Sequence, residues 1–259
     1  MNRIFKLGAA GVAALFLSLS AGAQKFALPV GGYQDGVRVL LIGNSFTYFH
    51  DCDTMLIRIG RSQGVKICLG EYLKGGQTFG QHLNLPSTGE AIAAGSYKVA
   101  FIQDQSVNAA VYARDGRKDV LRNTRALKER ILQASPDCRI ILERTWSYNG
   151  SDAGGFGTAE ELDKYLAKGT KAIARKARLE LSPIGDAFNL VRGERPEVNL
   201  FEPDDKHQSA VGSYLKCCVN WLILSGKPFS GEVDACGLDP ALAAYLRGVA
   251  ERIVRPEKQ

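Results

Sequence analysis

The stretch Val37-Arg38-Val39-Leu40-Leu41-Ile42-Gly43-Asn44-Ser45 determines the fold that we predict for this chain. Apart from Arg38, the residues before Gly43 are aliphatic, and the apolar run stops abruptly at that glycine. A short apolar run that ends at a turn residue is typical of a strand buried on both faces of a parallel sheet. Ligands bind beyond the carboxyl ends of the strands in such sheets. Ser45 therefore lies where chemistry is expected.

Similar apolar runs recur along the chain and alternate with segments of helical periodicity. The other predicted strands are 65–69, 98–103, 139–143 and 179–184. The predicted helices are 120–132, 158–177, 209–225 and 238–254. Thr158 and Glu161 form a capping-box pattern, and Gly226 is expected to end the third of these helices. This alternation predicts one three-layer α/β/α domain around a mostly parallel sheet of five strands, after an extended lead-in over 24–36.

The first 23 residues have the pattern of a secretory signal peptide. Arg3 and Lys6 precede an apolar run over 7–19, and Ala21-Gly22-Ala23 supplies the small residues of a cleavage site. The run is shorter than the roughly 20 residues that span a bilayer, which argues against the alternative of a retained anchor. We expect a secreted or periplasmic protein that comprises residues 24–259, without stable membrane insertion.

Charge and cysteine content narrow the classes of partner and cofactor. Removing Arg3 and Lys6 takes the formal net charge from +6 to +4, and the basic residues are mixed with acidic ones. That pattern favours a solvated surface over a nucleic-acid interface. An even number of cysteines in an exported chain permits disulfides, but their pairing is not readable from the sequence. Their spacings match no zinc-site pattern, and we expect neither a metal nor an organic cofactor. The cysteines are Cys52, Cys68, Cys138, Cys217, Cys218 and Cys236.

The segment Gly43-Asn44-Ser45-Phe46-Thr47 is the first candidate for chemistry. If a helix begins within these residues, its unpaired N–H groups lie close to the Ser45 hydroxyl. One alternative is a turn in which Ser45 only caps the helix. A second is a phosphate-binding loop, but the Gly-x-x-x-x-Gly-Lys pattern is missing.

The segment Asp204-Asp205-Lys206-His207 is the second candidate. A serine nucleophile needs a base within hydrogen-bond reach, and that base needs an acid on its other nitrogen. Asp204 precedes His207 by three residues, so its carboxylate can fold back onto Nδ1. The alternative is an acidic surface loop with an incidental histidine. We expect His50 to lie outside the reaction and His82 to lie on the surface.

The two segments in this order resemble the SGNH (GDSL-like) hydrolase superfamily, as a variant with Gly43-Asn44-Ser45 as its first block. The resemblance consists of short blocks along nearly the whole of 24–259. It implies a flavodoxin-like sheet, a catalytic triad of Ser45, Asp204 and His207, and no cofactor. It also implies that the backbone N–H of Ser45 and of a glycine in Lys74-Gly75-Gly76-Gln77-Thr78 form the oxyanion hole. Gly76 is our assignment, with Gly75 as the alternative.

One block departs from the family pattern, which usually reads Gly-x-Asn-Asp. Here the third predicted strand ends in Ile102-Gln103-Asp104-Gln105-Ser106-Val107-Asn108. A glutamine amide donates an N–H without charge, as the usual asparagine does. Gln105 is therefore the expected third oxyanion donor, Gln103 is its rival, and Asn108 ranks third.

These residues predict a serine esterase that hydrolyses short acyl esters, acetyl above all, on carbohydrate. Rival functions are a lipid esterase, a thioesterase or an acyltransferase with the same triad, and a non-catalytic glycan-binding protein. Trp146 and Tyr148 follow the fourth strand and either stack on a sugar or close the core. The segment 214–221 is expected in the core. The oligomeric state is left open.

Overall fold

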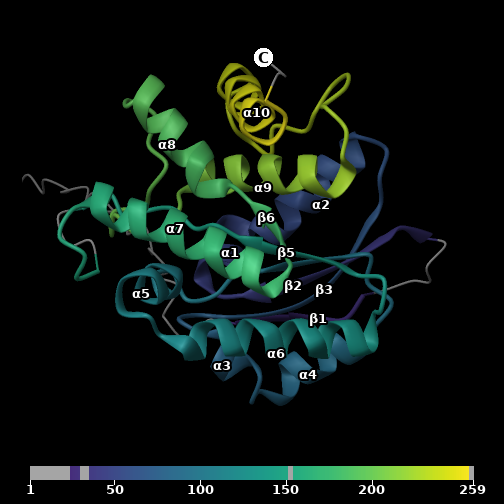
Figure 1. Cartoon of the computed structure of the whole chain (residues 1–259). Helices are drawn as coiled ribbons and strands as arrows, with labels where there is room; N and C mark the ends of the chain where they lie inside the picture. Colours follow the sequence, from purple (N-terminus) through teal and green to yellow (C-terminus); the bar gives the residue numbers. More distant parts are fainter. Residues whose placement is uncertain (1–23, 30–34, 151–153, 257–259) are drawn as a thin grey trace, which may run out of the picture.

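A sheet with parallel strands at its centre organises the protein (Figure 1). The computed structural model describes residues 24–29, 35–150 and 154–256, so the predicted signal peptide lies outside the described residues. Within these ranges, six strands form one sheet in the order β1-β3-β2-β4-β5-β6. The strands are β1 (Gln24–Ala27), β2 (Val37–Gly43), β3 (Ile67–Lys74), β4 (Val99–Ile102), β5 (Arg139–Glu143) and β6 (Glu180–Ser182).

Helices cover both faces of the sheet and make the outer layers. On one face lie α3, α4 and α6, and on the other lie α2 and α9, with α10 packed behind α9 (Figure 1). The helical segments are α1 (Ser45–Tyr48), the 3₁₀ helix η2 (Phe49–Asp51), α2 (Cys52–Ser62), α3 (Phe79–His82), α4 (Pro86–Ala93), α5 (Asn108–Asp115), α6 (Lys118–Ala134), α7 (Ala159–Ala177), α8 (Ile184–Glu194), α9 (Ala210–Ser225) and α10 (Pro240–Val254).

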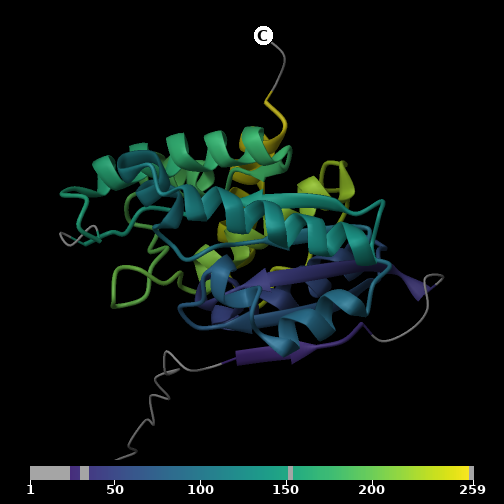
Figure 2. The same cartoon turned by 60° about the horizontal axis from the view of Figure 1, so that its bottom comes forward.

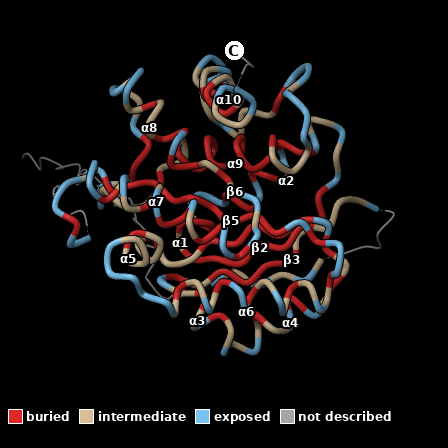
Figure 3. Tube along the Cα trace, viewed as in Figure 1, coloured by how far each residue is buried: buried red, intermediate tan, exposed pale blue. Residues whose placement is uncertain are grey.

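Strand β2 lies in the middle of the sheet because its side chains are apolar on both faces. Val39 and Leu41 join the core on the side of α2 and α9. Leu40 and Ile42 join the core on the side of α4 and α6. Figure 3 shows the burial of the central strands and of the sheet-facing sides of the helices. The predicted three-layer α/β/α fold is confirmed, and the five parallel strands have the flavodoxin-like order.

The sheet has one strand more than predicted. Part of the expected lead-in forms β1, which pairs antiparallel with β3 from Gln24 opposite Lys74 to Ala27 opposite Glu71. Figure 2 shows β1 along the outer edge of the sheet. Only four residues take part, which is too short for a recognisable alternation of polar and apolar side chains. The prediction of five strands was therefore wrong at this edge.

Strand β3 also runs further than the predicted 65–69, because polar residues interrupt its apolar pattern. Gly70 is needed for packing, since a Cβ there would lie 2.0 Å from the Tyr97 hydroxyl. Glu71 is buried, although carboxylates are seldom found inside a protein. The strand continues to Lys74 and so delivers the glycine turn that follows it to the edge where β2 ends.

The two predicted helix caps agree with the structure, whereas α6 extends two residues beyond the predicted 120–132 at each end. Thr158 and Glu161 form both hydrogen bonds of the capping box at the start of α7. Gly226 ends α9 with a φ of 65°. None of the helices among the described residues is long and apolar enough to cross a membrane.

The close crossing of α5 and α7 gives a test of packing. A Cβ on Gly169 would lie 1.8 Å from the Ala109 carbonyl oxygen, so the helices must move apart to accept one. We expect Gly169→Ala to lower the free energy of unfolding by about 1–3 kcal/mol. Gly248 is the matched control within α10, because a Cβ there meets nothing within 4 Å. Gly248→Ala should stabilise by about 0.5–1 kcal/mol. Urea denaturation measures both, and equal effects of the two substitutions would contradict the packing argument.

Burial of Glu71 predicts a pH-dependent stability. Its Oε2 atom is buried and has no hydrogen-bond partner among the described residues. Burial, assisted by the charge of nearby Asp53 and opposed by that of Lys25, raises the pKa of Glu71 to about 7. The folded protein therefore binds more protons than the unfolded chain between about pH 4.5 and pH 7. Stability should consequently fall as the pH rises through this window.

Glu71→Gln should remove that fall. The substitution should make little difference near pH 4.5 and stabilise by up to about 3 kcal/mol at pH 8, where the carboxylate is ionised in both states. Urea denaturation at the two pH values measures the difference. An equal effect of Glu71→Gln at both pH values would rule out this carboxyl as the cause.

Candidate active site

The turn after β2 places Ser45 at the start of α1. We call residues 43–48 the nucleophile turn. Asn44 caps α1, since its Oδ1 accepts the backbone N–H of Phe46 at 3.2 Å. Its Nδ2 donates to the carbonyl oxygens of Gln77 at 3.1 Å and Asp104 at 3.3 Å. A carboxylate cannot donate these two hydrogen bonds. An asparagine at this position therefore joins the nucleophile turn to the loops after β3 and β4.

Gly43 leaves room for the side chains that hold the turn. A Cβ there would lie 2.7 Å from Thr47 Oγ1 and 3.1 Å from Gln103 Oε1. The Gly43 carbonyl accepts from Nε2 of His82 at 3.0 Å. The expectation that His82 lies on the surface is wrong: it is fully buried on α3. The short α3 carries too few residues for its buried face to be recognised from periodicity.

The contacts of His82 define its protonation. Because the Gly43 carbonyl only accepts, Nε2 carries the proton, and Nδ1 accepts from the Thr88 hydroxyl at 3.0 Å. Burial lowers the pKa of His82 to about 4, although the bond to Gly43 opposes this. His82 is thus a neutral donor that fixes the end of β2.

The structure brings Ser45, His207 and Asp204 together in one line. Ser45 Oγ lies 2.8 Å from His207 Nε2, and His207 Nδ1 lies 2.5 Å from Asp204 Oδ2. The other oxygen of Asp204 accepts the backbone N–H groups of Lys206 at 3.0 Å and His207 at 2.9 Å. The segment therefore folds back as a single turn. Partial burial opposes ionisation of Asp204, but the hydrogen bonds outweigh it and hold its pKa below the usual range.

Aromatic rings hold the imidazole of His207 in place. The Phe49 ring stacks on it with centroids 4.2 Å apart and an angle of 7° between the planes. Phe46 approaches it edge-on at 5.4 Å. Positive φ angles at His50 and Asp51 then turn the chain into α2. His50 lies outside the line from Ser45 to Asp204, and its Nε2 is 2.7 Å from Glu202 Oε1.

A cavity of about 250 Å³ opens beside Ser45 and His207. Gly75 and Gly76 line it together with Gln105. Gln77 N donates to the Lys74 carbonyl at 3.2 Å across this tight turn, and Gly76 has a φ of 69°. That conformation favours glycine. The residues that line the cavity are Asn44, Ser45, Phe46, Tyr48, Phe49, Gly75, Gly76, Gln105, Ser106 and His207.

The three rival amides after β4 occupy different environments. Gln103 is 1% exposed, and its Oε1 accepts from Asn44 N and Thr47 Oγ1, both at 3.2 Å. Asn108 is the first residue of α5 and does not line the cavity. Only Gln105 among these three borders the cavity, where its Nε2 donates to Ser106 Oγ at 3.0 Å. An amide nitrogen carries a second hydrogen, as an oxyanion donor at this place requires.

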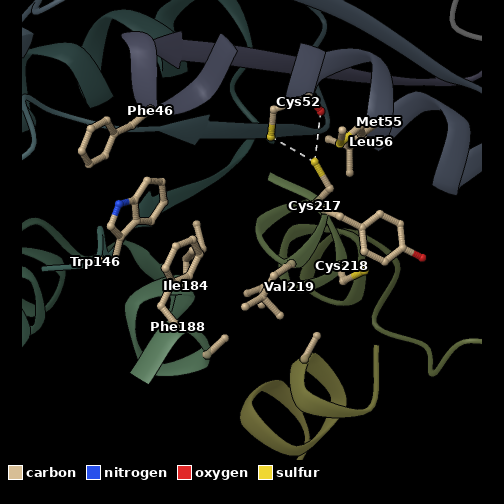
Figure 4. Close-up of a cluster of buried hydrophobic side chains, with 14 of the residues drawn as sticks. Phe46, Cys52, Met55, Leu56, Trp146, Ile184, Phe188, Cys217, Cys218 and Val219 are labelled. Atoms are coloured by element: carbon tan, nitrogen blue, oxygen red, sulfur yellow. Dashed lines mark hydrogen bonds between the residues drawn. The ribbon is translucent and has the colours of Figure 1, made fainter. Parts of the chain in front are cut away.

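Trp146 and Tyr148 belong to the core rather than to a sugar-binding surface. The indole of Trp146 is 1% exposed and lies between the rings of Phe46, at 4.6 Å, and Phe188, at 4.4 Å (Figure 4). Its Nε1 donates to the Lys206 carbonyl at 3.0 Å. Tyr148 is 7% exposed, and its hydroxyl lies 2.7 Å from Ser106 Oγ.

Sequence reasoning missed a buried ion pair below the nucleophile turn. Lys216 and Glu143 have side chains that are each 2% exposed, with Nζ and Oε2 2.7 Å apart. The segment 214–221 was predicted to lie in the core, and it does. The one signal was a lysine in an otherwise largely apolar helical stretch. No group of three or more potential metal ligands occurs within the part of the chain that the structure describes.

Solved structures of other proteins have a fold similar to that of this chain. No family model matches the chain, and no curated protein matches its sequence. A DUF4886 family protein from Bacteroides uniformis has a similar structure, with a TM-score of 0.69, 20% identity and coverage of 86% of this chain and 97% of that one. A candidate SGNH hydrolase from Slackia heliotrinireducens is also similar, with a TM-score of 0.60 and 20% identity. That match covers 73% of this chain and 99% of the other. A variant of an acetyl xylan esterase from Geobacillus stearothermophilus has a TM-score of 0.56 and 17% identity, and the match covers 76% of this chain and 98% of the other. The chain therefore has the SGNH hydrolase fold, as its sequence blocks predict.

Proposed function

We propose that this protein is a secreted or periplasmic serine esterase that removes short acyl groups, acetyl above all, from carbohydrate. The observation that carries the proposal is the line of hydrogen bonds from Ser45 Oγ through His207 to Asp204. A hydroxyl, an imidazole and a carboxylate in this order are the parts of a serine hydrolase. Ser45 and His207 border a cavity large enough for a small substrate.

We assign a role to each group on the basis of this geometry. Ser45 Oγ attacks the acyl carbonyl carbon while His207 Nε2 takes its proton. Asp204 holds the imidazole in the tautomer with Nδ1 protonated and stabilises the imidazolium. The protonated His207 then gives its proton to the leaving alcohol. Water, deprotonated by His207, then attacks the acyl carbon; the bond to Ser45 Oγ breaks, the carboxylic acid leaves, and His207 returns the proton to Ser45 Oγ.

The developing oxyanion needs donors on the side of the cavity away from His207. We assign the backbone N–H groups of Ser45 and Gly76 and the side-chain amide of Gln105. Ser45 N stands at the first position of α1, where a helical N–H has no partner within its own helix. Loss of one such donor typically raises the barrier by about 2.7–4 kcal/mol.

The cavity favours a short acyl group. Its volume of about 250 Å³ is below the roughly 300–1,000 Å³ of pockets that enclose drug-sized ligands. Tyr48, Phe49, Gly75 and Gly76 are among the residues that bound it. The acetyl xylan esterase with a similar structure acts on an acetylated glycan, which supports the same substrate class here.

Two assays test this function. The first compares hydrolysis of p-nitrophenyl acetate, butyrate and octanoate by the wild-type protein and Ser45→Ala, and the second measures acetate release from acetylated xylan. We expect the wild-type protein to prefer the acetate, to release acetate from xylan, and to lose both activities with Ser45. Faster turnover of octanoate would favour the lipid esterase, and equal rates for wild type and Ser45→Ala would rule out the hydrolase. Export predicts a mature N-terminus at Gln24 in protein isolated from the producing cells.

A further inference from the structure

The ion pair of Lys216 and Glu143 lies directly behind the nucleophile turn. Lys216 Nζ donates to the Phe46 carbonyl at 2.8 Å, to Thr47 Oγ1 at 3.1 Å and to Glu143 Oε2 at 2.7 Å. These contacts use all three ammonium hydrogens. The second carboxylate oxygen of Glu143 accepts from Asn220 at 2.7 Å.

The short α1 explains why a donor is needed there. A single helical turn cannot satisfy its own carbonyl groups by internal hydrogen bonds. At the end of α1 the Ser45 carbonyl accepts the backbone N–H of Phe49. The Phe46 carbonyl instead accepts from Lys216 and, at 3.2 Å, from Gln208 Nε2. Two side chains of the segment that follows His207 therefore hold the backbone next to Ser45.

A buried ion pair contributes little to stability when well-packed apolar side chains are the alternative. An apolar residue at 216 would still pack in α9, but it would leave the Phe46 carbonyl without its ammonium donor. Stability alone thus gives no reason for a charge at this place. The hydrogen bonds from Lys216 to the Phe46 carbonyl and Thr47 Oγ1 do give a reason for a charge there.

We propose that Lys216 is a positioning residue: by holding the Phe46 carbonyl and Thr47, it fixes Ser45 Oγ relative to His207 Nε2. Glu143 accepts from the ammonium on its other side and so orients it toward the turn. The proposal rests on the proposed esterase function. A shift of a nucleophile by about 1 Å is sufficient to cost two orders of magnitude in rate.

Three variants separate positioning from stability. Lys216→Met removes the donor and leaves the buried Glu143 carboxylate without its cation, so it should lower both kcat and the melting temperature. Lys216→Met/Glu143→Gln removes both charges and keeps the acceptor for Asn220, so most of the melting temperature should return. The matched control is Arg144→Met, because Arg144 is a 2% exposed cation that pairs with Asp163 and Asp186 and not with the nucleophile turn. It should lower the melting temperature without lowering kcat in protein that remains folded.

The expected result is that the double variant keeps a kcat roughly 10- to 100-fold below wild type, with KM unchanged. The ¹³C chemical shift of the Phe46 carbonyl should change in both Lys216 variants and not in Arg144→Met. A double variant with restored stability, wild-type kcat and an unchanged Phe46 signal would overturn the proposal. If the wild-type protein hydrolysed no ester, the proposed function would fail, and the carbonyl signal alone would still decide whether Lys216 holds the turn.

A second observation stands apart from the catalytic groups. Cys52, the first residue of α2, and Cys217, in the middle of α9, have their sulfur atoms 3.0 Å apart. They are 4% and 1% exposed, respectively. Figure 4 shows the two sulfurs facing each other and Cys218 directed away from Cys52. The contact joins the helix after the nucleophile turn to the helix after His207.

We infer that Cys52 and Cys217 form a disulfide when the protein enters an oxidising compartment. Each thiol loses one hydrogen, and a sulfur–sulfur bond forms. The two electrons and two protons pass to a disulfide oxidant, a protein or small-molecule disulfide, which leaves as two thiols. The cross-link would close a loop of 165 residues and stabilise α2 against α9.

Peptide mapping tests the cross-link. The purified protein is incubated with oxidised glutathione, denatured, and alkylated before digestion. We expect a disulfide between the peptides that contain Cys52 and Cys217, and its retention in Cys218→Ala. Reductant should lower the melting temperature of the oxidised protein by about 10 °C and leave that of Cys52→Ala/Cys217→Ala unchanged. Alkylation of both thiols, or a disulfide between other cysteines, would overturn the inference.

Discussion

Ser45→Ala should lower kcat for ester hydrolysis by about four to six orders of magnitude. The hydroxyl of Ser45 is the group in line with His207 Nε2, and the substitution removes it while leaving the cavity intact. His207→Ala should cost about as much, because each residue depends on the other for proton transfer. The effects should not add: the double variant should be no slower than either single variant by more than a few-fold.

Two further variants make this prediction specific. Asp204→Asn should slow hydrolysis by about two to four orders of magnitude, since the amide no longer holds the reactive tautomer of His207. Ser225→Ala, at the end of α9 and far from the cavity lining, should keep the wild-type rate. Steady-state kinetics with p-nitrophenyl acetate measures all of these. Wild-type kcat in Asp204→Asn would contradict the assigned role of the carboxylate.

Trp146→Ala should lower the free energy of unfolding by about 3–5 kcal/mol. The indole fills the space between Phe46 and Phe188, so its removal leaves a cavity in the core (Figure 4). The substitution also removes the hydrogen bond from Nε1 to the Lys206 carbonyl, next to His207. We therefore expect a loss of activity that accompanies the loss of stability.

Trp146→Phe is the matched control for the stack. It keeps an aromatic ring between Phe46 and Phe188 but has no donor for the Lys206 carbonyl. It should cost less than half as much stability as the alanine variant. Guanidinium denaturation followed by circular dichroism gives both values. A cost below about 1 kcal/mol for Trp146→Ala would show that the stack is not a main part of the core.

The sequence was most informative where one local signal decided the structure. The aliphatic run before Gly43 has few alternatives to a buried strand, and its end fixes the place of Ser45. Asp204 and His207 are close enough in sequence for a single turn to join them, and the structure brings them together. The helix caps at Thr158 and Gly226 are equally local, and they form as predicted.

The failures concern features that depend on distant parts of the chain. Strand β1 is too short to be recognised without its partner, strand β3. Strand β3 is itself hard to recognise, because Gly70 and Glu71 interrupt its apolar pattern. The burial of His82 is possible because both ring nitrogens have hydrogen-bond partners: the Gly43 carbonyl accepts from Nε2, and the Thr88 hydroxyl donates to Nδ1. Lys216 is buried because Glu143 and the nucleophile turn meet its ammonium. Such polar contacts across the fold leave no periodic pattern in the sequence.

The sequence also left three amides open for the oxyanion hole, and the contacts separate them. Gln103 holds Asn44 and Thr47 from within the core, which explains the need for a glycine at 43. Gln105 is the one that borders the cavity. A side chain's direction at the end of a strand depends on the loop that follows, and alternation along β4 does not fix it.

Covalent labelling tests the central claim most directly. The protein is incubated with diisopropyl fluorophosphate, which phosphorylates serines activated by a neighbouring base, and the labelled residue is identified by mass spectrometry. We predict one adduct, on Ser45, whose formation is lost in His207→Ala and slowed in Asp204→Asn. An unlabelled protein, or labelling of another serine at the same rate in His207→Ala, would contradict the assignment of Ser45 as the nucleophile.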